Sequence, residues 1–236
     1  MDSIMKYFNE IKEEFYFNFI EDDRYMYLID GLYNTLSITF FALIIGFLLG
    51  MFLAFIRTTH DKTGNLKIIN FFANIYITLI RGTPVMLQLL IVYFVIFGSI
   101  RIDKVLVAVI AFGLNSAAYV AEIFRSGIMS IEKGQFEAGR SLGFNYIKTM
   151  QYIVFPQAVK NVLPALGNEF IVLLKETSVV GYIALQDITR GADTIRSITY
   201  SPFMPLLGAA AMYLTLVLIF TKLVNILERR LRESDH

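Results

Sequence analysis

The sequence predicts an all-α, polytopic membrane protein with five transmembrane helices, an N-terminal interfacial helix and a cytoplasmic segment between two helices. Hydrophobic residues make up 56% of its 236 residues, whereas soluble domains are about 45–50% apolar. The mean hydropathy is +0.59. Apolar stretches close to the ~20 residues needed to cross a bilayer recur along the chain. No repeat or low-complexity linker divides them, so we expect a single membrane domain over residues 1–236.

Residues 1–27 predict a helix that lies in the membrane interface. Ile4, Phe8, Ile11, Phe15 and Phe19 recur every three to four residues, and Lys and Glu residues occupy the opposite face. This pattern is typical of an amphipathic helix with its aromatic face in the lipid. The alternative is a helix that packs against another subunit.

Three stretches are apolar enough to predict membrane spans directly: residues 32–56, 105–124 and 204–226. The stretch over 66–97 is longer than one span needs, and its first half carries polar residues on one helical face. Arg81, Gly82 and Pro84 lie between its halves, and proline interrupts helical hydrogen bonding. We therefore predict one kinked span here.

The stretch over 158–180 is the least hydrophobic of the predicted spans. It carries Lys160, Asn161, Asn168, Glu169 and Lys175. Such groups are costly against lipid, so we expect this helix inside the bundle, with its polar face toward a partner or a wet pathway. The connection over 190–201 is expected to be external, with one short helix.

Five spans place the termini on opposite sides of the membrane. More Lys and Arg residues fall on the cytoplasmic side if the N-terminus is outside and the C-terminus is inside. This orientation also puts residues 130–156 in the cytoplasm. Arg229 and Arg230 near the C-terminus predict attraction to anionic membrane lipid.

Several kinds of chemistry have no residues to support them. The chain has no cysteine and only two histidines, His60 and His236, neither in a cluster with metal-ligand spacing. It has no glycine-rich loop ending in Lys-Ser or Lys-Thr, so we expect no nucleotide site, no cofactor and no catalysis in this chain. No basic tract suggests nucleic acid. Any ATP and Mg²⁺ would belong to a partner.

Residues 137–156 read EAGRSLGFNYIKTMQYIVFP and predict short helices on the surface, because apolar residues alternate with charged ones at helical spacing. Gly139 and Gly143 would leave a flat strip for another backbone. Phe155 and Pro156 would end the unit. An ordinary solvated loop is the alternative.

This stretch resembles the EAA loop of permease subunits of ATP-binding-cassette (ABC) importers. The matching residues are Glu137-Ala138-Gly139, Gly143 and Ile153-Val154-Phe155-Pro156, with Gly139 and Phe155 departing from the family's alanine and leucine. The resemblance implies the type I importer permease fold and a cytoplasmic helix that docks on an ATPase subunit. It assigns the coupling contact to Glu137, Ala138, Gly139, Arg140, Leu142 and Gly143.

Other motifs are similar to the polar amino acid branch of these importers, which serves His, Glu, Gln or Arg. They are IRGTPV followed by QL at 80–89, SAAY with EIFR and GI at 116–128, and LKETS at 174–178. The resemblance covers most of the chain. It implies a multi-pass inner membrane permease that works with a second permease copy or similar chain, two ABC ATPase subunits and an external substrate-binding protein. A homodimer and a heterodimer both satisfy the sequence.

The predicted substrate pathway consists of polar residues within the spans: Asn115, Ser116, Tyr119, Glu122 and Glu169. Facing inward, they could bind the charged groups of an amino acid, and a carboxylate on the path would favour a cationic one. The alternatives are hydrogen bonds between packed helices for Asn115 and Ser116, and an ion pair with Arg125 for Glu122.

The run Lys175, Glu176, Thr177 and Ser178 is predicted to lie near the outer mouth, as a gate or a contact for the binding protein. Arg81 either faces the pathway or snorkels to the membrane surface. Two other functions stay open: an ion-coupled secondary amino acid carrier, and a membrane scaffold that transports nothing. Neither explains the EAA-like segment.

Overall fold

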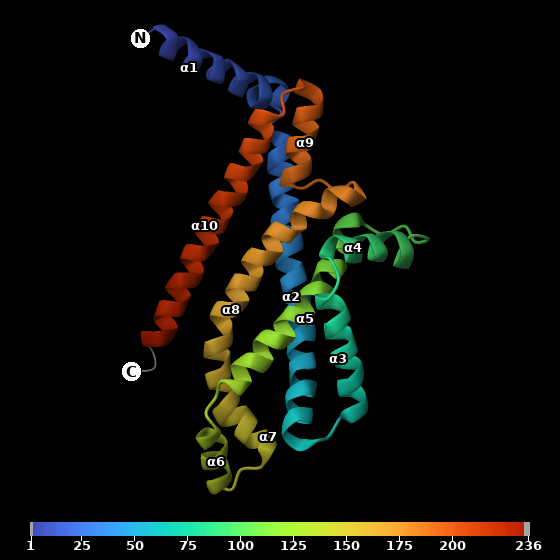
Figure 1. The fold of residues 1–236 in the computed structure, drawn as a ribbon, viewed down its shortest axis with the longest axis vertical. Coiled ribbons are helices and arrows are strands. Elements are labelled where there is room, and N and C mark those ends of the chain that lie inside the picture. The colour runs from blue at the N-terminus through green and yellow to red at the C-terminus, as the bar shows by residue number, and fades with distance from the viewer. Residues whose placement is uncertain (1, 234–236) are drawn as a thin grey trace.

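The computed structural model describes residues 2–233, and every regular element in that range is a helix (Figure 1). Within this range, three helices are long and apolar enough to cross a membrane, and they coincide with the three spans predicted most directly. They are α2 (Met26–Thr63), α5 (Lys104–Met129) and α10 (Phe203–Glu233). Each is longer than its predicted apolar stretch, because polar residues at the ends continue the helix.

The stretch predicted as one kinked span is broken more sharply than a kink. Helix α3 (Lys67–Arg81) ends just before Gly82, and α4 (Val85–Leu90) starts after Pro84 and is continued by a π-helical segment, Ile91–Ile96. The two parts meet at 109°. Pro84 is extended (φ −63°, ψ 135°), so it ends one direction and starts another. The predicted break point is confirmed, and the bend is larger than a proline kink alone would give.

Helix α8 (Phe155–Glu176) takes the place of the fourth predicted span and continues as a 3₁₀ segment, η5 (Thr177–Ile183). The expectation that Phe155 and Pro156 end the preceding unit is wrong. Phe155 is helical and Pro156 sits in the first turn of α8. A first-turn proline needs no N–H donor, so it starts the helix instead of breaking it.

The N-terminal helix α1 (Asp2–Phe15) projects away from the bundle (Figure 1). Ile4, Phe8, Ile11 and Phe15 are exposed along it, as an interfacial helix requires. Phe19 is not part of this face: it is buried and packs against Gly208 of α10. A π-helical turn at Tyr16–Ile20 shifts the helical register, so the exposed stripe ends before it.

The packing of α2 on α5 fixes the centre of the molecule. A side-chain carbon on Gly46 would lie 2.7 Å from Cβ of Ser116, and one on Gly50 would lie 2.7 Å from Cβ of Val120. Small residues four apart let two membrane helices approach this closely. As a result, most of α5 is buried, and its polar residues face other helices or a cavity.

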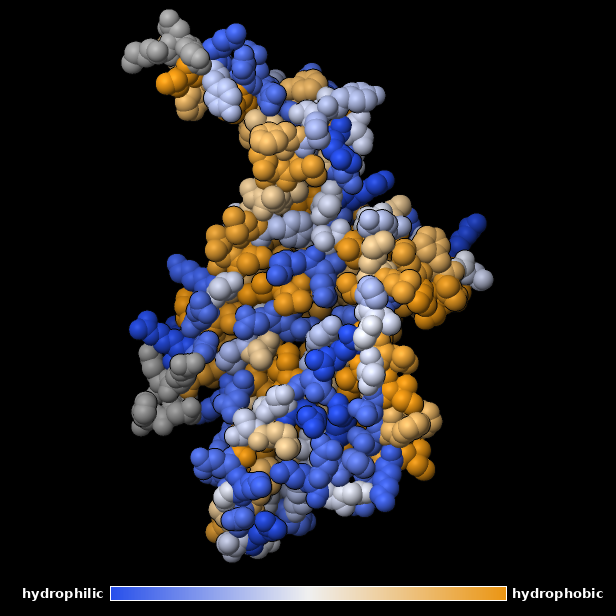
Figure 2. All heavy atoms as spheres, in the orientation of Figure 1, coloured by the Kyte–Doolittle hydropathy of each residue, from blue (hydrophilic) through white to orange (hydrophobic). Residues whose placement is uncertain are grey.

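The remaining helices complete the bundle. Helix α9 (Ile188–Thr199) confirms the short helix expected in the connection before α10. Helices α6 (Lys133–Ser141) and α7 (Tyr146–Thr149) lie together at the end of the molecule opposite α1 (Figure 1). Hydrophilic side chains gather over the lower parts of α5 and α8, whereas the edges formed by α3 and α4 are hydrophobic (Figure 2). This distribution predicts that the polar face meets protein or water and the apolar edges meet lipid.

Candidate functional site

The segment predicted to couple to an ATPase forms two short helices, which excludes the solvated loop. Helix α6 ends at Ser141; Gly143, two residues later, has a φ of +79°, and the amide of Phe144 donates to the carbonyl of Gly139 at 3.0 Å. This is the arrangement of a glycine-terminated helix. Asn145 then starts α7 by accepting from the amide of Lys148 at 2.9 Å. The chain therefore turns tightly and packs α7 against α6.

The two glycines of this segment do different things. A side-chain carbon on Gly139 would lie 2.6 Å from Cγ2 of Thr149. Gly139 is therefore buried against the chain's own α7, and the expectation that it offers a free strip to another protein is wrong. Gly143 faces open space, and its left-handed backbone is the reason for a glycine there.

Four of the predicted coupling residues have exposed side chains: Glu137, Ala138 and Arg140 on α6, and Leu142 directly after it. The side chain of Leu142 is 70% exposed. An exposed apolar side chain surrounded by charged ones is the composition of a protein contact surface. These four residues form the part of the predicted coupling contact that faces outward.

Three of the five predicted pathway residues line one open cavity of about 670 Å³ between α5 and α8. Tyr119 and Glu122 come from α5, and Glu169 comes from α8. Arg81, at the end of α3, joins them, with its guanidinium carbon 5.5 Å from the centre of the Tyr119 ring. The cavity continues down to Asn161, whose side chain donates to Ser130 at 3.0 Å. Of the polar residues predicted for the fourth span, Asn161 and Glu169 line this cavity, whereas Lys160, Asn168 and Lys175 do not.

Asn115 and Ser116 lie behind the cavity and do not line it. Asn115 is 2% exposed and donates to the side-chain oxygen of Gln88 at 2.9 Å. Gln88 in turn donates to the carbonyl of Ile80 at 2.7 Å and to the hydroxyl of Thr83 at 2.8 Å. This chain of hydrogen bonds ties α5 to the break between α3 and α4.

The two carboxylates of the cavity have different partners. Glu169 is 7% exposed and accepts one hydrogen bond from Ser116 Oγ, at 2.8 Å; no described cation forms an ion pair with it. Glu122 bonds directly to Arg57 of α2, and Arg81 and Arg125 lie 3.9 and 4.0 Å away. Glu122 therefore has arginine partners within the chain, whereas Glu169 has no cationic partner among the described residues.

The ion pair expected between Glu122 and Arg125 is the longest of three. Arg57 forms the close one, and Arg125 also lies 3.3 Å from Asp61. The sequence reading missed Arg57 and Asp61. Both follow the apolar part of α2, and their spacing of four residues is a signal that both face one side of a helix.

The run predicted at the outer mouth is only partly exposed. Lys175 is exposed at the end of α8, whereas Thr177 is buried and donates to the carbonyl of Leu174 at 2.8 Å. Glu176 is half-buried, and Ser178 lines a separate cavity of about 300 Å³ with Asp187. Of the four, Thr177 alone is buried, and Lys175, Glu176 and Ser178 keep surface accessible to a partner.

Asp187 holds the start of α9 in place beside this cavity. Its carboxylate accepts from the amides of Thr189 and Arg190 at 3.0 and 2.9 Å and from the Tyr213 hydroxyl at 3.1 Å. Burial raises the pKa of Asp187, and the two amides oppose the rise.

A helical membrane chain with a polar central cavity and an exposed, EAA-like helix pair has the features of an ABC importer permease. Residues 46–233 match the family model of the binding-protein-dependent transport system inner membrane component. The chain therefore belongs to this family of permease subunits. Its homologues lack an ATPase site of their own, and ATP is hydrolysed by a partner subunit.

Two relatives illustrate the similarity along the whole chain. The arginine transport system permease protein ArtQ of Bacillus subtilis (strain 168) is 41% identical over 211 residues, which cover 89% of this chain and 94% of ArtQ. The glutamine transport system permease protein GlnP of Escherichia coli (strain K12) is 35% identical over 208 residues, which cover 87% and 93%.

Solved structures agree with the fold. A crystal structure of an amino acid ABC transporter with histidines superimposes with a TM-score of 0.81 at 45% identity, covering 90% of this chain and 98% of that one. An inward-facing structure of the MetNI methionine ABC transporter gives a TM-score of 0.75 at 18% identity, covering 87% and 96%. The second likeness concerns the fold alone.

Proposed function

We propose that this permease imports a polar amino acid, with a preference for a cationic one, through the cavity between α5 and α8. The observation that carries the substrate class is Glu169. Its carboxylate is almost completely buried, lines the cavity and has, among residues 2–233, only a serine hydroxyl as partner. An unpaired charge in this position is costly, and a cationic substrate would offset that cost. The arginine relative supports the cationic preference, whereas the glutamine relatives and the structure with histidines support the broader class of polar amino acids.

The energy would come from ABC ATPase subunits that dock on the exposed face of α6. Nucleotide binding would bias the permease between two states, as alternating access requires. The exposed Leu142 and its charged neighbours support this contact. A second permease chain and an external binding protein complete the proposed assembly. ATP and Mg²⁺ would bind to the ATPase subunits.

The proposed orientation places α1 outside and α6, α7 and the C-terminus in the cytoplasm. Helices α1 and α6 lie at opposite ends of the molecule, which supports it (Figure 1). Counting α3 with α4 as one broken span, and α8 as another, gives the five crossings that this orientation needs.

The substrate assignment is tested by transport competition. Proteoliposomes that contain the permease, its ATPase and its binding protein would be loaded with ATP, and uptake of arginine and glutamine would be compared for the wild type and Glu169→Gln. We expect the preference for the cation to be lost in the variant. An unaltered preference would refute the role of Glu169.

The coupling assignment is tested by Leu142→Asp and by a bulky substitution such as Gly143→Val. Both should uncouple ATP hydrolysis from uptake, the first by placing a charge in the contact and the second by straining the left-handed turn. Copurification of an ATPase subunit would separate an ABC permease from an ion-coupled carrier. Unchanged uptake by both variants would contradict the docking surface.

A further inference from the structure

Along one face of α2, the side chains pass from apolar to hydroxyl-bearing and then to cationic. Its side chains recur every three to four residues and therefore share one face. They are apolar first, then carry hydroxyls, and end in a cation: Leu48, Met51, Phe52, Phe55, Thr58, Thr59 and Lys62. This order from hydrocarbon to polar to charged is the order met when moving outward through one leaflet of a bilayer.

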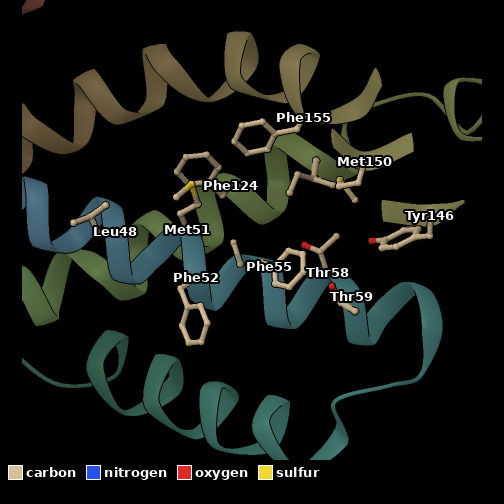
Figure 3. A pocket seen from close by; sticks show the side chains of 12 residues that line it. Leu48, Met51, Phe52, Phe55, Thr58, Thr59, Phe124, Tyr146, Met150 and Phe155 are labelled. Atoms are coloured by element: carbon tan, nitrogen blue, oxygen red, sulfur yellow. The ribbon is translucent and has the colours of Figure 1, made fainter. Parts of the chain in front are cut away.

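The apolar part of this face lines a cavity of about 320 Å³ that has no part in the proposed translocation path. Its other side is closed by Phe124 of α5, by Met150 of the π-helical segment Met150–Val154 and by Phe155 at the start of α8 (Figure 3). Leu48 and Phe52 are 57% and 61% exposed, so the cavity opens on the outer surface of the bundle. An apolar cavity open to the lipid-facing surface can accept a hydrocarbon chain.

Hydroxyl groups collect at one end of this cavity. The side chains of Thr58, Thr59 and Tyr146 point their oxygens toward the same region (Figure 3). Thr58 is 2% exposed, yet its hydroxyl has no hydrogen-bond partner among the described residues. A threonine within a helix normally bonds to the carbonyl four residues earlier. The hydroxyl of Tyr146 also has no hydrogen-bond partner among the described residues, so it is free to donate to a ligand. The end of the cavity thus has hydrogen-bonding groups to offer a ligand.

A second cavity of about 410 Å³ adjoins the first, because Tyr146 lines both. Three cations line it, Lys62, Lys133 and Arg140, against one carboxylate, Glu137. Lys62 is held with its ammonium 4.5 Å from the centre of the Phe136 ring. None of the three cations forms an ion pair with a carboxylate of the described residues. The second cavity is therefore complementary to an anion.

The spacing along α2 matches the depth of one leaflet. Ten residues separate Leu48 from Thr58, which is about 15 Å of helix. Half of a hydrocarbon core ~30 Å thick is the same distance. A lipid whose chain reaches the level of Leu48 would hold its ester groups at Thr58 and its phosphate beyond them, at the level of Lys62.

We propose that one anionic phospholipid binds between α2 and the α6–α7 segment, with an acyl chain in the first cavity and its phosphate in the second. Thr58 and Tyr146 would donate to an ester carbonyl, and Lys62 and Lys133 would hold the phosphate. Only the choice of the cytoplasmic leaflet rests on the orientation proposed above. Because Glu137 and Arg140 also belong to the proposed ATPase contact, the lipid would lie directly beside it.

The test compares lipids by their effect on the thermal unfolding midpoint of the purified full-length chain in mild detergent. Dioleoylphosphatidylglycerol should raise the midpoint, and dioleoylphosphatidylcholine should raise it much less. Inorganic phosphate and glycerophosphoglycerol carry the charge without the chains and should have no effect. An equal response to both lipids would overturn the proposal, and so would a response to phosphate alone. These readouts need no transport activity, so they stand apart from the proposed function.

Two pairs of lysine variants distinguish a specific headgroup site from general attraction of the positively charged surface to anionic lipid. The pair Lys62→Gln and Lys133→Gln should raise the half-saturating concentration of the anionic lipid about tenfold or more. The matched pair Lys67→Gln and Lys148→Gln removes two exposed cations that do not line the cavity, and it should respond as the wild type does. Equal losses in both pairs would show general charge attraction and overturn the site.

The chain site has its own variants. Met51→Trp should fill the first cavity and remove the lipid response. Thr58→Val keeps the size of the side chain and removes only an unpaired hydroxyl. This variant should therefore fold even if Met51→Trp fails to fold. It should weaken the lipid response several-fold. In native mass spectrometry the wild type should retain one anionic lipid; wild-type binding by Thr58→Val, or a protein chain found in place of the lipid, would contradict the assignment.

Discussion

Glu169 and Glu122 line the same cavity, yet their carboxylates have different kinds of partner. Glu122 is surrounded by three arginines from α2, α3 and α5. Glu169 has one serine hydroxyl. A charge that is neutralised by its own chain holds helices together, whereas a buried charge left without a counterion is available to a substrate. The comparison shows that the position of an acid in a membrane bundle does not define its role; its partners do.

The largest effect on stability is expected when Glu122 loses its close partner, Arg57. Replacement Arg57→Met removes the close partner and leaves a carboxylate that is only partly exposed. We expect a loss of about 2 kcal/mol in the free energy of unfolding, measured from detergent-based denaturation. The double variant with Glu122→Gln removes both charges and should recover part of the loss. If Arg57→Met alone were as stable as the wild type, Glu122 would not have the structural role that distinguishes it from Glu169.

The second effect concerns Glu169. Glu169→Gln keeps the size of the side chain and the oxygen that accepts from Ser116, so the stability should change by less than about 0.5 kcal/mol. Uptake of a cationic amino acid relative to a neutral one should fall about tenfold, which corresponds to about 1.4 kcal/mol. A stability loss as large as that of Arg57→Met would mean that both acids are structural.

A smaller effect is expected for the partner of Glu169. Ser116→Ala removes one hydrogen bond to the carboxylate but keeps the Cβ that packs on Gly46. We expect a loss of stability of about 1 kcal/mol. Competition binding of the cationic substrate should weaken less than in Glu169→Gln. A larger effect on substrate preference than that of Glu169→Gln would place the serine, not the acid, at the centre of recognition.

The smallest effect is expected for Asn115 and Gln88, and it tests whether Asn115 lies outside the substrate site. Asn115 and Gln88 are bonded to each other behind the cavity. A double-mutant cycle with Asn115→Ala and Gln88→Ala should give a coupling energy of about 0.5–1 kcal/mol in stability. Neither variant should change the preference among amino acids. A changed preference would return Asn115 to the pathway.

Much of the fold follows from the sequence because long apolar runs leave few options in a membrane. Helices α2, α5 and α10 and the break before Pro84 could be predicted in this way. The 109° angle at that break could not, because it depends on where α4 finds neighbours to pack against. The burial of Phe19 was missed because a π-helical turn breaks the three-to-four spacing on which the prediction relied.

The sequence identifies which residues belong to the site better than it predicts how they are arranged. The polar residues of α5 were identified, but spacing alone could not show that Ser116 and Asn115 face other helices while Tyr119 and Glu122 face the cavity. That division depends on the close packing of α5 on Gly46 and Gly50, which turns Ser116 toward α2. Gly139 was assigned to another protein because one sequence cannot show that Thr149 folds back onto it.

The most direct test of the account is the side of the membrane on which Leu142 lies. The chain contains no cysteine, so Leu142→Cys and Tyr200→Cys each give a single thiol at an exposed site, 70% and 91% exposed in the native side chains. In intact cells a membrane-impermeant maleimide should label Tyr200→Cys and should label Leu142→Cys only after permeabilisation. Labelling of Leu142→Cys in intact cells would contradict the account, because an ATPase in the cytoplasm could not reach α6.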